Sequence, residues 1–249
     1  MVKTTVVSVS YNTRELTALL LWSLHRILDE PEVSILVVDN GSIDGSAELL
    51  HHAAQAGVCQ LIVNESNLGH GPALELAMRT ELAAKAERVW ILDSDCVVSR
   101  PDAQRAPLAT HPGAAIIGES HWDRWRQRMR PALYSLIVDP SALDRPDVAG
   151  FVDGGDPVWE LLTSAERAGL SIADFPFAAD GHVIHVGRAS LAAVAAAKNP
   201  SHPLYQWACE HNQPHFGEIE GASDRHAQIF ARFHDEVGAD LDLAAALHA

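Results

Sequence analysis

The first hundred residues alternate short β-branched runs with segments whose apolar residues recur at helical spacing. This alternation is typical of β-α-β units around a mostly parallel sheet. The runs are short and apolar, as expected of strands that are covered on both faces, and each ends in a polar residue. The predicted strands are Val6–Ser10, Ile35–Asp39, Leu61–Val63 and Val89–Asp93.

Start signals mark the helices between these strands. Asn12 with Glu15 three residues later resembles a capping box, which predicts that the first helix begins at Asn12. A second helix is expected after Asp44-Gly45-Ser46. A third is expected to open at Pro72, because proline suits the first position of a helix.

After about residue 100 the pattern is less regular. Ala115–Gly118 is one further predicted strand, and Val158–Ala168 has the apolar spacing of a helix that Gly169 ends. His121–Arg130 combines two tryptophans with four arginines. We interpret it either as a loop or short helix that contacts an anionic group, or as a solvated basic helix with packed tryptophans.

The composition is that of a globular protein. With 249 residues, of which 47% are hydrophobic, the chain can close a sizeable core. The formal net charge of -15, from 33 acidic and 18 basic residues, repels a polyphosphate backbone. Nucleic acid is therefore not an expected partner.

Targeting signals and a disulfide framework are both absent from the sequence pattern. No apolar run approaches the roughly 20 residues that span a bilayer, and the N-terminal residues do not resemble a signal peptide, so we expect a cytoplasmic protein without a transmembrane segment. Cys59, Cys96 and Cys209 are odd in number and have no Cys-x-x-Cys spacing. They are expected to be buried free thiols.

Polar residues follow each of the first four predicted strands. In open α/β sheets the ligand binds beyond the carboxyl ends of the strands, where loops and helix N-termini converge. The four strand ends therefore predict one shared site. They run into Ser10-Tyr11-Asn12, Asp39-Asn40-Gly41-Ser42, Asn64 to Asn67, and Asp93-Ser94-Asp95.

The usual phosphate-binding signatures are missing. Val9-Ser10-Tyr11-Asn12 occupies the turn where a dinucleotide-binding sheet has Gly-x-Gly-x-x-Gly, and no Gly-Lys-Ser/Thr loop occurs. Asp93 and Asp95, at the end of a buried strand, instead suggest that two carboxylates share a divalent cation. Such a cation neutralises a pyrophosphate and makes it a better leaving group.

Four segments taken together resemble glycosyltransferase family 2. They occur in the family's order and spacing over roughly residues 1 to 100, and the second is the most specific. The resemblance implies an α/β GT-A fold, with a Rossmann-like, mostly parallel sheet, and an inverting, nucleotide-sugar-dependent enzyme with an Asp-x-Asp motif. The segments are Val7-Ser8-Val9-Ser10-Tyr11-Asn12, Val37 to Ser46, Asn67-Leu68-Gly69 and Asp93-Ser94-Asp95.

The resemblance also implies roles for individual residues of the donor site. The segment around Tyr11 and Asp39 is expected to cradle the base, and Asn67 to Gly71 to lie along the nucleotide. Asp93 is expected to hold the ribose or the metal, and Asp95 to ligate the metal directly. Asp39 and Asn67 also suit plain turn-forming roles. The full set expected at the nucleotide is Ser10, Tyr11, Asn12, Asp39, Asn67, Gly71, Asp93 and Ser94.

Inverting transfer needs a carboxylate that takes the proton of the acceptor hydroxyl. In the family this residue precedes a helix in the second half, and the matching stretch here is Phe151–Trp159. The family's adjacent Glu-Asp pair is absent. Asp153, on a glycine-rich turn, and Asp156, before Pro157, are both candidate bases, with a slight preference for Asp153. Asp156 also suits a helix N-cap.

A histidine is the remaining candidate metal ligand. Ile184–Ser190 resembles the family's histidine followed by Gly-Gly and serine, although Arg188 replaces the second glycine. His185 is therefore expected to complete the metal site, because neutral imidazole is a competent ligand. A core histidine bonded to backbone is the alternative, and His182 is a poorer candidate.

These observations predict a hexosyltransferase-like enzyme that depends on Mn²⁺ or Mg²⁺. It would move a sugar with inversion from a nucleotide diphosphate sugar to a hydroxyl of a small or lipid-linked acceptor. The sequence leaves the oligomeric state open. We expect one GT-A domain over residues 1–249, with residues 1–100 binding the nucleotide sugar and 101–249 forming the acceptor side and a C-terminal elaboration.

Two alternatives are kept. A sugar nucleotidyltransferase also uses metal-bound carboxylates, but its glycine-rich, basic signature after the first strand is missing. A catalytically silent nucleotide-sugar-binding module is suggested by the absent Glu-Asp pair and by Arg188. Turnover of a donor with any acceptor distinguishes this module from an enzyme.

Overall fold

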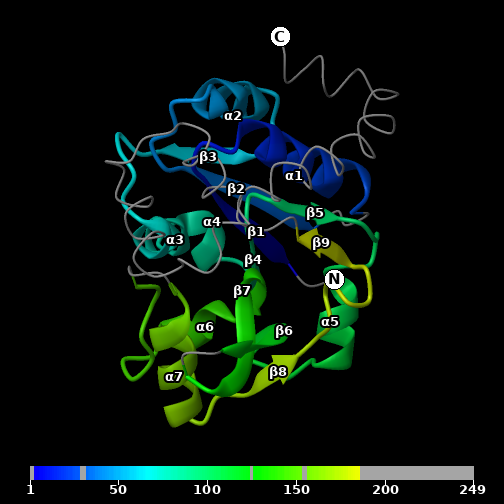
Figure 1. Ribbon diagram of the computed structural model, residues 1–249, viewed down its shortest axis with the longest axis vertical. Helices are drawn as coiled ribbons and strands as arrows, with labels where there is room; N and C mark the ends of the chain where they lie inside the picture. The colour runs from blue at the N-terminus through cyan, green and yellow to red at the C-terminus, as the bar shows by residue number, and fades with distance from the viewer. Residues whose placement is uncertain (1–2, 29–31, 124–125, 153–155, 186–249) are drawn as a thin grey trace.

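The computed structural model describes residues 3–28, 32–123, 126–152 and 156–185. Within them, a seven-stranded sheet has the order β3-β2-β1-β4-β7-β6-β8, and a two-stranded sheet joins β5 and β9 (Figure 1). The strands are β1 (Thr4–Ser10), β2 (Val33–Asp39), β3 (Gln60–Val63), β4 (Arg88–Leu92), β5 (Cys96–Val98), β6 (Ile116–Asp123), β7 (Arg128–Val138), β8 (Ile172–Asp174) and β9 (Val183–His185).

The first four strands, β1 to β4, are parallel. β1 pairs with β2 and with β4, and β2 pairs with β3, all in parallel register. β7 then runs antiparallel to β4, and β6 antiparallel to β7. The carboxyl ends of β1 to β4 consequently lie at one edge of the sheet, as the sequence predicted.

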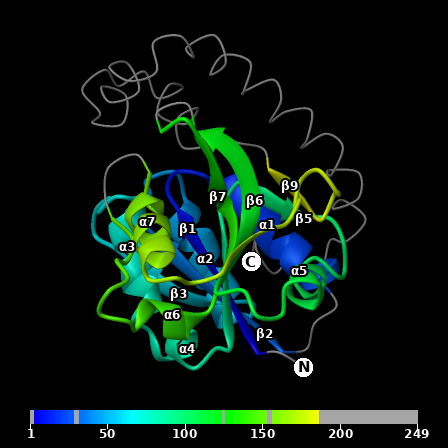
Figure 2. The same ribbon diagram turned by 90° about the horizontal axis from the view of Figure 1, so that it is seen from below.

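Helices cover both faces of the large sheet. Alternate residues of each strand point to opposite faces, so Val7 and Ile91 join one core while Val6 and Trp90 join the other. Figure 2 shows α3, α6 and α7 on one side of β6 and β7, and α1 and α5 on the other. The helices are α1 (Arg14–Arg26), α2 (Ser46–Gln55), α3 (His70–Met78), α4 (Glu81–Ala84), α5 (Arg105–Thr110), α6 (Pro140–Leu143) and α7 (Trp159–Arg167).

Two predicted helix starts are wrong. α1 begins at Arg14 rather than Asn12, whose φ of 52° is left-handed and whose side-chain oxygen accepts from the Ile43 N–H at 2.8 Å. Asn12 therefore bridges two loops instead of capping a helix. α3 begins at His70, so Pro72 is its third residue.

The basic segment His121–Arg130 forms strand ends and a turn rather than a helix over its described residues. Its two ends are paired antiparallel strands, with Trp122 opposite Met129 and Asp123 opposite Arg128. The predicted strand Ala115–Gly118 is thus the start of the longer β6. The helix predicted over Val158–Ala168 is present as α7, and Gly169, with a φ of 72°, follows its C-cap.

In the part of the chain that the structure describes, no helix combines the length and apolar character needed to cross a bilayer. The described cysteines, Cys59 and Cys96, are buried and free, as predicted. Cys209 lies outside the described residues.

Candidate active site

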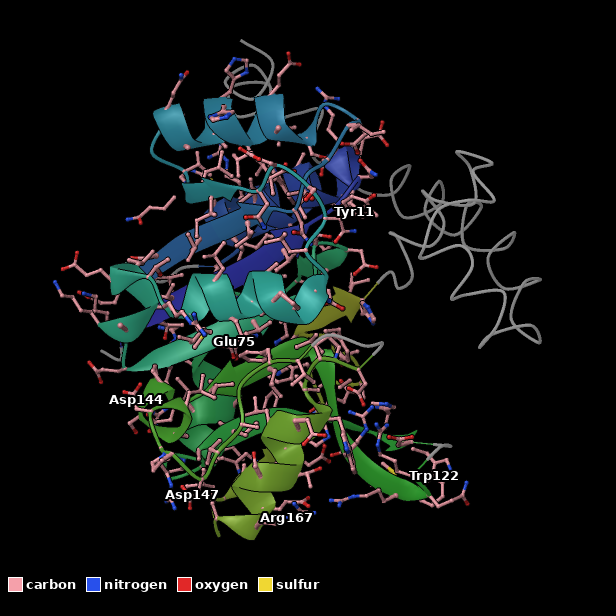
Figure 3. The ribbon with its side chains drawn as sticks, turned by 90° about the vertical axis from the view of Figure 1, so that its left-hand side faces the viewer. Tyr11, Glu75, Trp122, Asp144, Asp147 and Arg167 are labelled. Atoms are coloured by element: carbon pink, nitrogen blue, oxygen red, sulfur yellow. The ribbon has the colours of Figure 1, made fainter. Side chains whose placement is uncertain are left out.

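The polar residues at the ends of β1 and β2 are direct neighbours. Ser10 lies opposite Asp39 in the parallel register, and the Asn40 N–H donates to the Ser10 carbonyl at 2.8 Å. Tyr11, which follows β1, is partly exposed at this edge (Figure 3). The strand ends therefore meet where the sequence placed the donor site.

Buried hydroxyl groups connect the end of β1 to the Asp93-Ser94-Asp95 turn. The hydroxyls of Ser10 and Thr17 share a hydrogen bond of 2.9 Å, and Thr17 is 3.1 Å from Thr13. Thr13 is in turn 3.0 Å from the Ser94 hydroxyl. This network fixes the turn against the start of α1. Ser10 and Ser94, which were predicted at the nucleotide, are both buried in it.

Asn40 is the centre of a second network, which the sequence did not reveal. Its side chain donates to Asn67 Oδ1 at 2.8 Å and accepts from the Asn64 side chain at 2.9 Å. Asn67 Oδ1 also accepts from the Gly69 N–H at 2.8 Å. Asn67 therefore has the turn-forming role that was its alternative, and it holds the loop beside the end of β2.

Gly41 is required where these loops meet. A Cβ on Gly41 would lie 2.6 Å from the backbone of Ser66, and its φ of 78° is left-handed. Any residue with a side chain would therefore be strained at position 41, both by its Cβ contact and by its backbone conformation. The glycine of the Asp-Asn-Gly-Ser segment thus allows two loops of the site to touch.

Asp39 is almost fully buried, with 1% of its surface exposed. One oxygen, Oδ2, accepts from the Ser42 N–H at 3.2 Å and caps the turn. The other, Oδ1, is buried and has no hydrogen-bond partner among the described residues. A buried acceptor of this kind is costly unless a ligand donates to it.

Asp93 and Asp95 meet two imidazoles at the carboxyl end of β4. His185 Nε2 lies 3.5 Å from Asp95 Oδ1 and 3.9 Å from Asp93 Oδ2. His70 Nε2 lies 3.8 Å from Asp93 Oδ1. The predicted metal residues Asp93, Asp95 and His185 are therefore brought together, and His70 at the start of α3 joins them.

The charge of Asp93 is poorly compensated. Burial raises the pKa of its carboxyl; His70 and His185 lower this pKa, and Asp95 raises it further. Asp93 Oδ1 is buried without a hydrogen-bond partner in the described chain. A cation at this position would stabilise the ionised carboxylates.

Cys96 lies beside this cluster. Its sulfur is within 4.8 Å of ligand atoms of Asp95 and His185. Burial raises the pKa of the thiol well above its ordinary value, and Sγ donates to the Tyr134 carbonyl at 3.2 Å. Asp95, Cys96 and His185 thus bring a carboxylate oxygen, a thiol sulfur and an imidazole nitrogen within 4.8 Å of one another.

Asp156 does not have the cap role that its sequence suggested. The N-cap of α7 is Val158, without a side-chain hydrogen bond. The Asp156 carboxylate instead lies 2.5 Å from Arg130 and 3.3 Å from Arg126, and Arg130 also contacts Asp123 at 2.7 Å. Asp153, the preferred base, lies outside the described residues.

The segment that leads to Asp153 packs against α3. A Cβ on Gly71 would lie 1.9 Å from the Val152 carbonyl oxygen. Four residues further along α3, Glu75 accepts from the Phe151 N–H at 2.6 Å. Gly71, which was predicted at the nucleotide, thus allows the second half of the chain to approach the start of α3. Figure 3 labels Glu75 on this helix.

His182, the poorer ligand candidate, lies elsewhere. It is buried, its Nδ1 is 3.6 Å from Asp102, and its ring contacts Phe175. Sequence reasoning missed Glu75 and Tyr134, and it placed Asn40 and His70 in site segments without giving either a role of its own. The glycines on either side of His70 were a local signal that could have pointed to it. No local sequence pattern pointed to Tyr134.

The N-terminal part of the chain is similar to a known protein family. Residues 5–116 match the model of the family described as glycosyl transferase family 2. Over these residues the chain is similar to that family. The N-acetylglucosaminyl-diphospho-decaprenol L-rhamnosyltransferase of Mycobacterium tuberculosis is a similar protein, 32% identical over 137 residues. The match covers 54% of this chain and 41% of the relative, so the chain spans less than half of that protein.

Two solved structures have a fold similar to that of this chain. The mannosyltransferase PcManGT from Pyrobaculum calidifontis, in complex with GDP-Man and Mn²⁺, has a TM-score of 0.59 at 18% identity, covering 99% of this chain and 80% of the other. Glucosyl-3-phosphoglycerate synthase from Mycobacterium tuberculosis, with Mn²⁺, UDP and phosphoglyceric acid, has a TM-score of 0.53 at 17% identity, covering 70% and 68%. The predicted GT-A fold is confirmed.

The carboxylates and histidines of this cluster fit a divalent cation. Two atoms bound to one cation at about 2.1 Å each lie roughly 3.0 to 4.2 Å apart, depending on the angle between them. The three carboxylate-to-imidazole separations, 3.5, 3.8 and 3.9 Å, fall in this range. Carboxylate oxygen with imidazole suits Mn²⁺, and a largely carboxylate set suits Mg²⁺.

Proposed function

We propose that this chain is an inverting glycosyltransferase that moves a sugar from a nucleotide diphosphate sugar to an acceptor hydroxyl. The observation that supports it most is the meeting of Asp93, Asp95 and His185 at the sheet edge that also carries Asp39. A nucleotide would find a partner for its base in Asp39, at the end of β2. The residues at the end of β4 would hold its pyrophosphate through a cation.

The donor site divides between these two strand ends. Asp39 Oδ1, buried and unpartnered among the described residues, would accept from a base N–H. Asp93, Asp95 and His185 would hold Mn²⁺ or Mg²⁺. When bound, the cation supplies charge that stabilises the departing diphosphate. The two similar solved structures hold GDP-Man and UDP, which supports a nucleotide diphosphate as donor.

Asp153 is the proposed base. Its carboxylate would take the acceptor hydroxyl proton as the oxygen attacks the anomeric carbon, and the bond from that carbon to the diphosphate oxygen would break with its electron pair. The ion pairs of Asp156 with two arginines support this choice. So does the contact of Val152 with Gly71, one residue from His70.

A lipid-linked acceptor is the proposed substrate class. The name of the Mycobacterium tuberculosis relative describes transfer to a sugar on diphospho-decaprenol. An acceptor of this class presents a sugar hydroxyl ahead of an anionic diphosphate.

The metal site is tested by calorimetry with UDP, GDP and dTDP, with and without Mn²⁺. At least one nucleotide is expected to bind more tightly with Mn²⁺, and Asp95→Ala to remove that difference because a direct ligand is lost. Asp147→Ala is the matched control, since this exposed carboxylate pairs with Arg145 and lies far from Tyr11 (Figure 3). Equal Mn²⁺ dependence in wild type and Asp95→Ala would reject the assignment.

A silent binding module remains the second candidate, favoured by the missing Glu-Asp pair. Such a module would bind the same nucleotides as the enzyme, with the same dependence on metal. The two are separated by release of nucleotide diphosphate from nucleotide sugars in the presence of prenyl-diphosphate-linked GlcNAc. Binding without any release, across all the donors tested, would favour the module.

A further inference from the structure

The ring of Tyr134 lies flat against the imidazole of His185. Their centroids are 4.4 Å apart and their planes differ by 5°. Tyr134 is on β7 and buried, whereas His185 is on β9, in the other sheet. This contact therefore links the candidate metal ligand to the central sheet, and it leaves the edge of the imidazole directed at Asp93 and Asp95.

Tyr134 is itself held at its far end. Its hydroxyl donates to Glu119 Oε2, and the same oxygen accepts from the Ala178 N–H at 2.5 Å. Glu119 lies on β6, the strand paired with β7. The tyrosine ring is thus fixed at both ends, by its backbone in the sheet and by its hydroxyl.

The backbone of Tyr134 contacts the turn that carries Asp93 and Asp95. Its carbonyl accepts from the Asp93 N–H at 3.0 Å and from Cys96 Sγ at 3.2 Å. The ring therefore positions the histidine, while the carbonyl positions the turn that contains Asp93 and Asp95. One residue thus contacts both groups that have to converge on a cation.

We propose that Tyr134 is a positioning residue for the metal site, which sets the plane of the His185 imidazole. The inference rests on the proposed function, because it requires a cation at Asp93, Asp95 and His185. A ligand whose orientation is fixed before binding loses less freedom when the metal arrives, and partners of metal ligands commonly change affinity by about 10-fold to 100-fold.

Mn²⁺ affinity, measured by the electron paramagnetic resonance of free Mn²⁺ in a titration, tests this role. Tyr134→Leu keeps the carbonyl contacts but removes the ring, and is expected to raise the Kd for Mn²⁺ about 10-fold to 100-fold. Tyr134→Phe keeps the ring and is expected to restore most of the affinity. In a His185→Ala background, Tyr134→Leu is expected to have no further effect, because the group that it orients is gone.

Leu50→Ala controls for a general loss of stability. Leu50 is fully buried on α2, in a different core cluster from Tyr134, so its substitution is expected to lower Tm without changing the Kd for Mn²⁺. If His185→Ala weakens Mn²⁺ binding but Tyr134→Leu does not, the inference is wrong and the proposed metal site stands. If the wild-type chain binds no Mn²⁺, the metal site fails, and the role of Tyr134 fails with it.

Discussion

The carboxylate of Asp156 lies between the guanidinium groups of Arg126 and Arg130, and Arg126 also covers the Trp159 ring at 3.9 Å. Each oxygen of Asp156 already accepts from an arginine, so that proton transfer to this carboxylate would disrupt both ion pairs. Asp156 therefore has the contacts of a structural residue. It joins the β6–β7 hairpin to the start of α7.

Substitution separates this role from that of a base. Asp153→Asn is expected to lower kcat by about 10²-fold to 10⁴-fold with unchanged nucleotide binding, because a general base is lost. Asp156→Asn is expected to keep most of kcat but to lower the free energy of unfolding by about 1–3 kcal/mol, because charged hydrogen bonds are lost. Steady-state kinetics and urea unfolding measure the two effects. The reverse pattern would make Asp156 the base.

The sequence could not separate these two aspartates for a physical reason. The local sequence shows Asp156 before a proline, which favours a cap. Its actual partners, Arg126 and Arg130, lie 30 and 26 residues away along the chain and meet it only when the hairpin folds. Asp93 and Asp95 were predictable because adjacent residues of one strand and turn define them.

At the scale of elements, α3 joins the two halves of the proposed site. Its first residue, His70, faces Asp93, while Gly71 contacts Val152 and Glu75 bonds to Phe151. The helix therefore places the segment before Asp153 beside the donor residues. A shift of α3 would move both.

Gly71→Ala tests this contact. In an open helix, alanine is about 1 kcal/mol more favourable than glycine. Here its Cβ would lie 1.9 Å from the Val152 oxygen, so we expect a loss of about 1–3 kcal/mol in unfolding free energy and a larger fall in transfer than in nucleotide affinity. Gly113→Ala, with no neighbour within 4 Å, is the control. Equal stability of both variants would contradict the close contact.

Elements with a local pattern were predictable, and those that depend on distant partners were not. The first four strands, β1 to β4, were found because an apolar run ending in a polar residue needs no tertiary information, whereas β5, which pairs with the distant β9, was not predicted. The hairpin around His121–Arg130 was missed because its arginines resemble a solvated face. Their partners are Asp123, Asp156 and, for Arg128, Glu166 on α7.

At the scale of the molecule, the two halves share one sheet. β4 belongs to the first hundred residues, and its outer neighbour is β7, which follows residue 127. The pairing of β5 with β9 adds a second link, and it carries Cys96 opposite His185. The proposed metal site thus lies across the junction of the proposed nucleotide and acceptor halves. This supports the proposal of one GT-A domain.

Ligand-dependent unfolding tests that organisation. A ligand at 100 times its Kd stabilises the native state by about 2.7 kcal/mol, which for a chain of this size corresponds to a rise in Tm of roughly 5–10 °C. Because the junction carries the ligands, Mn²⁺ with the preferred nucleotide is expected to shift one cooperative calorimetric transition as a whole. Asp95→Ala should lose the Mn²⁺-dependent part of the shift. Two transitions, of which the ligand moves only the first, would mean that the halves unfold separately and that β4 and β7 do not couple them.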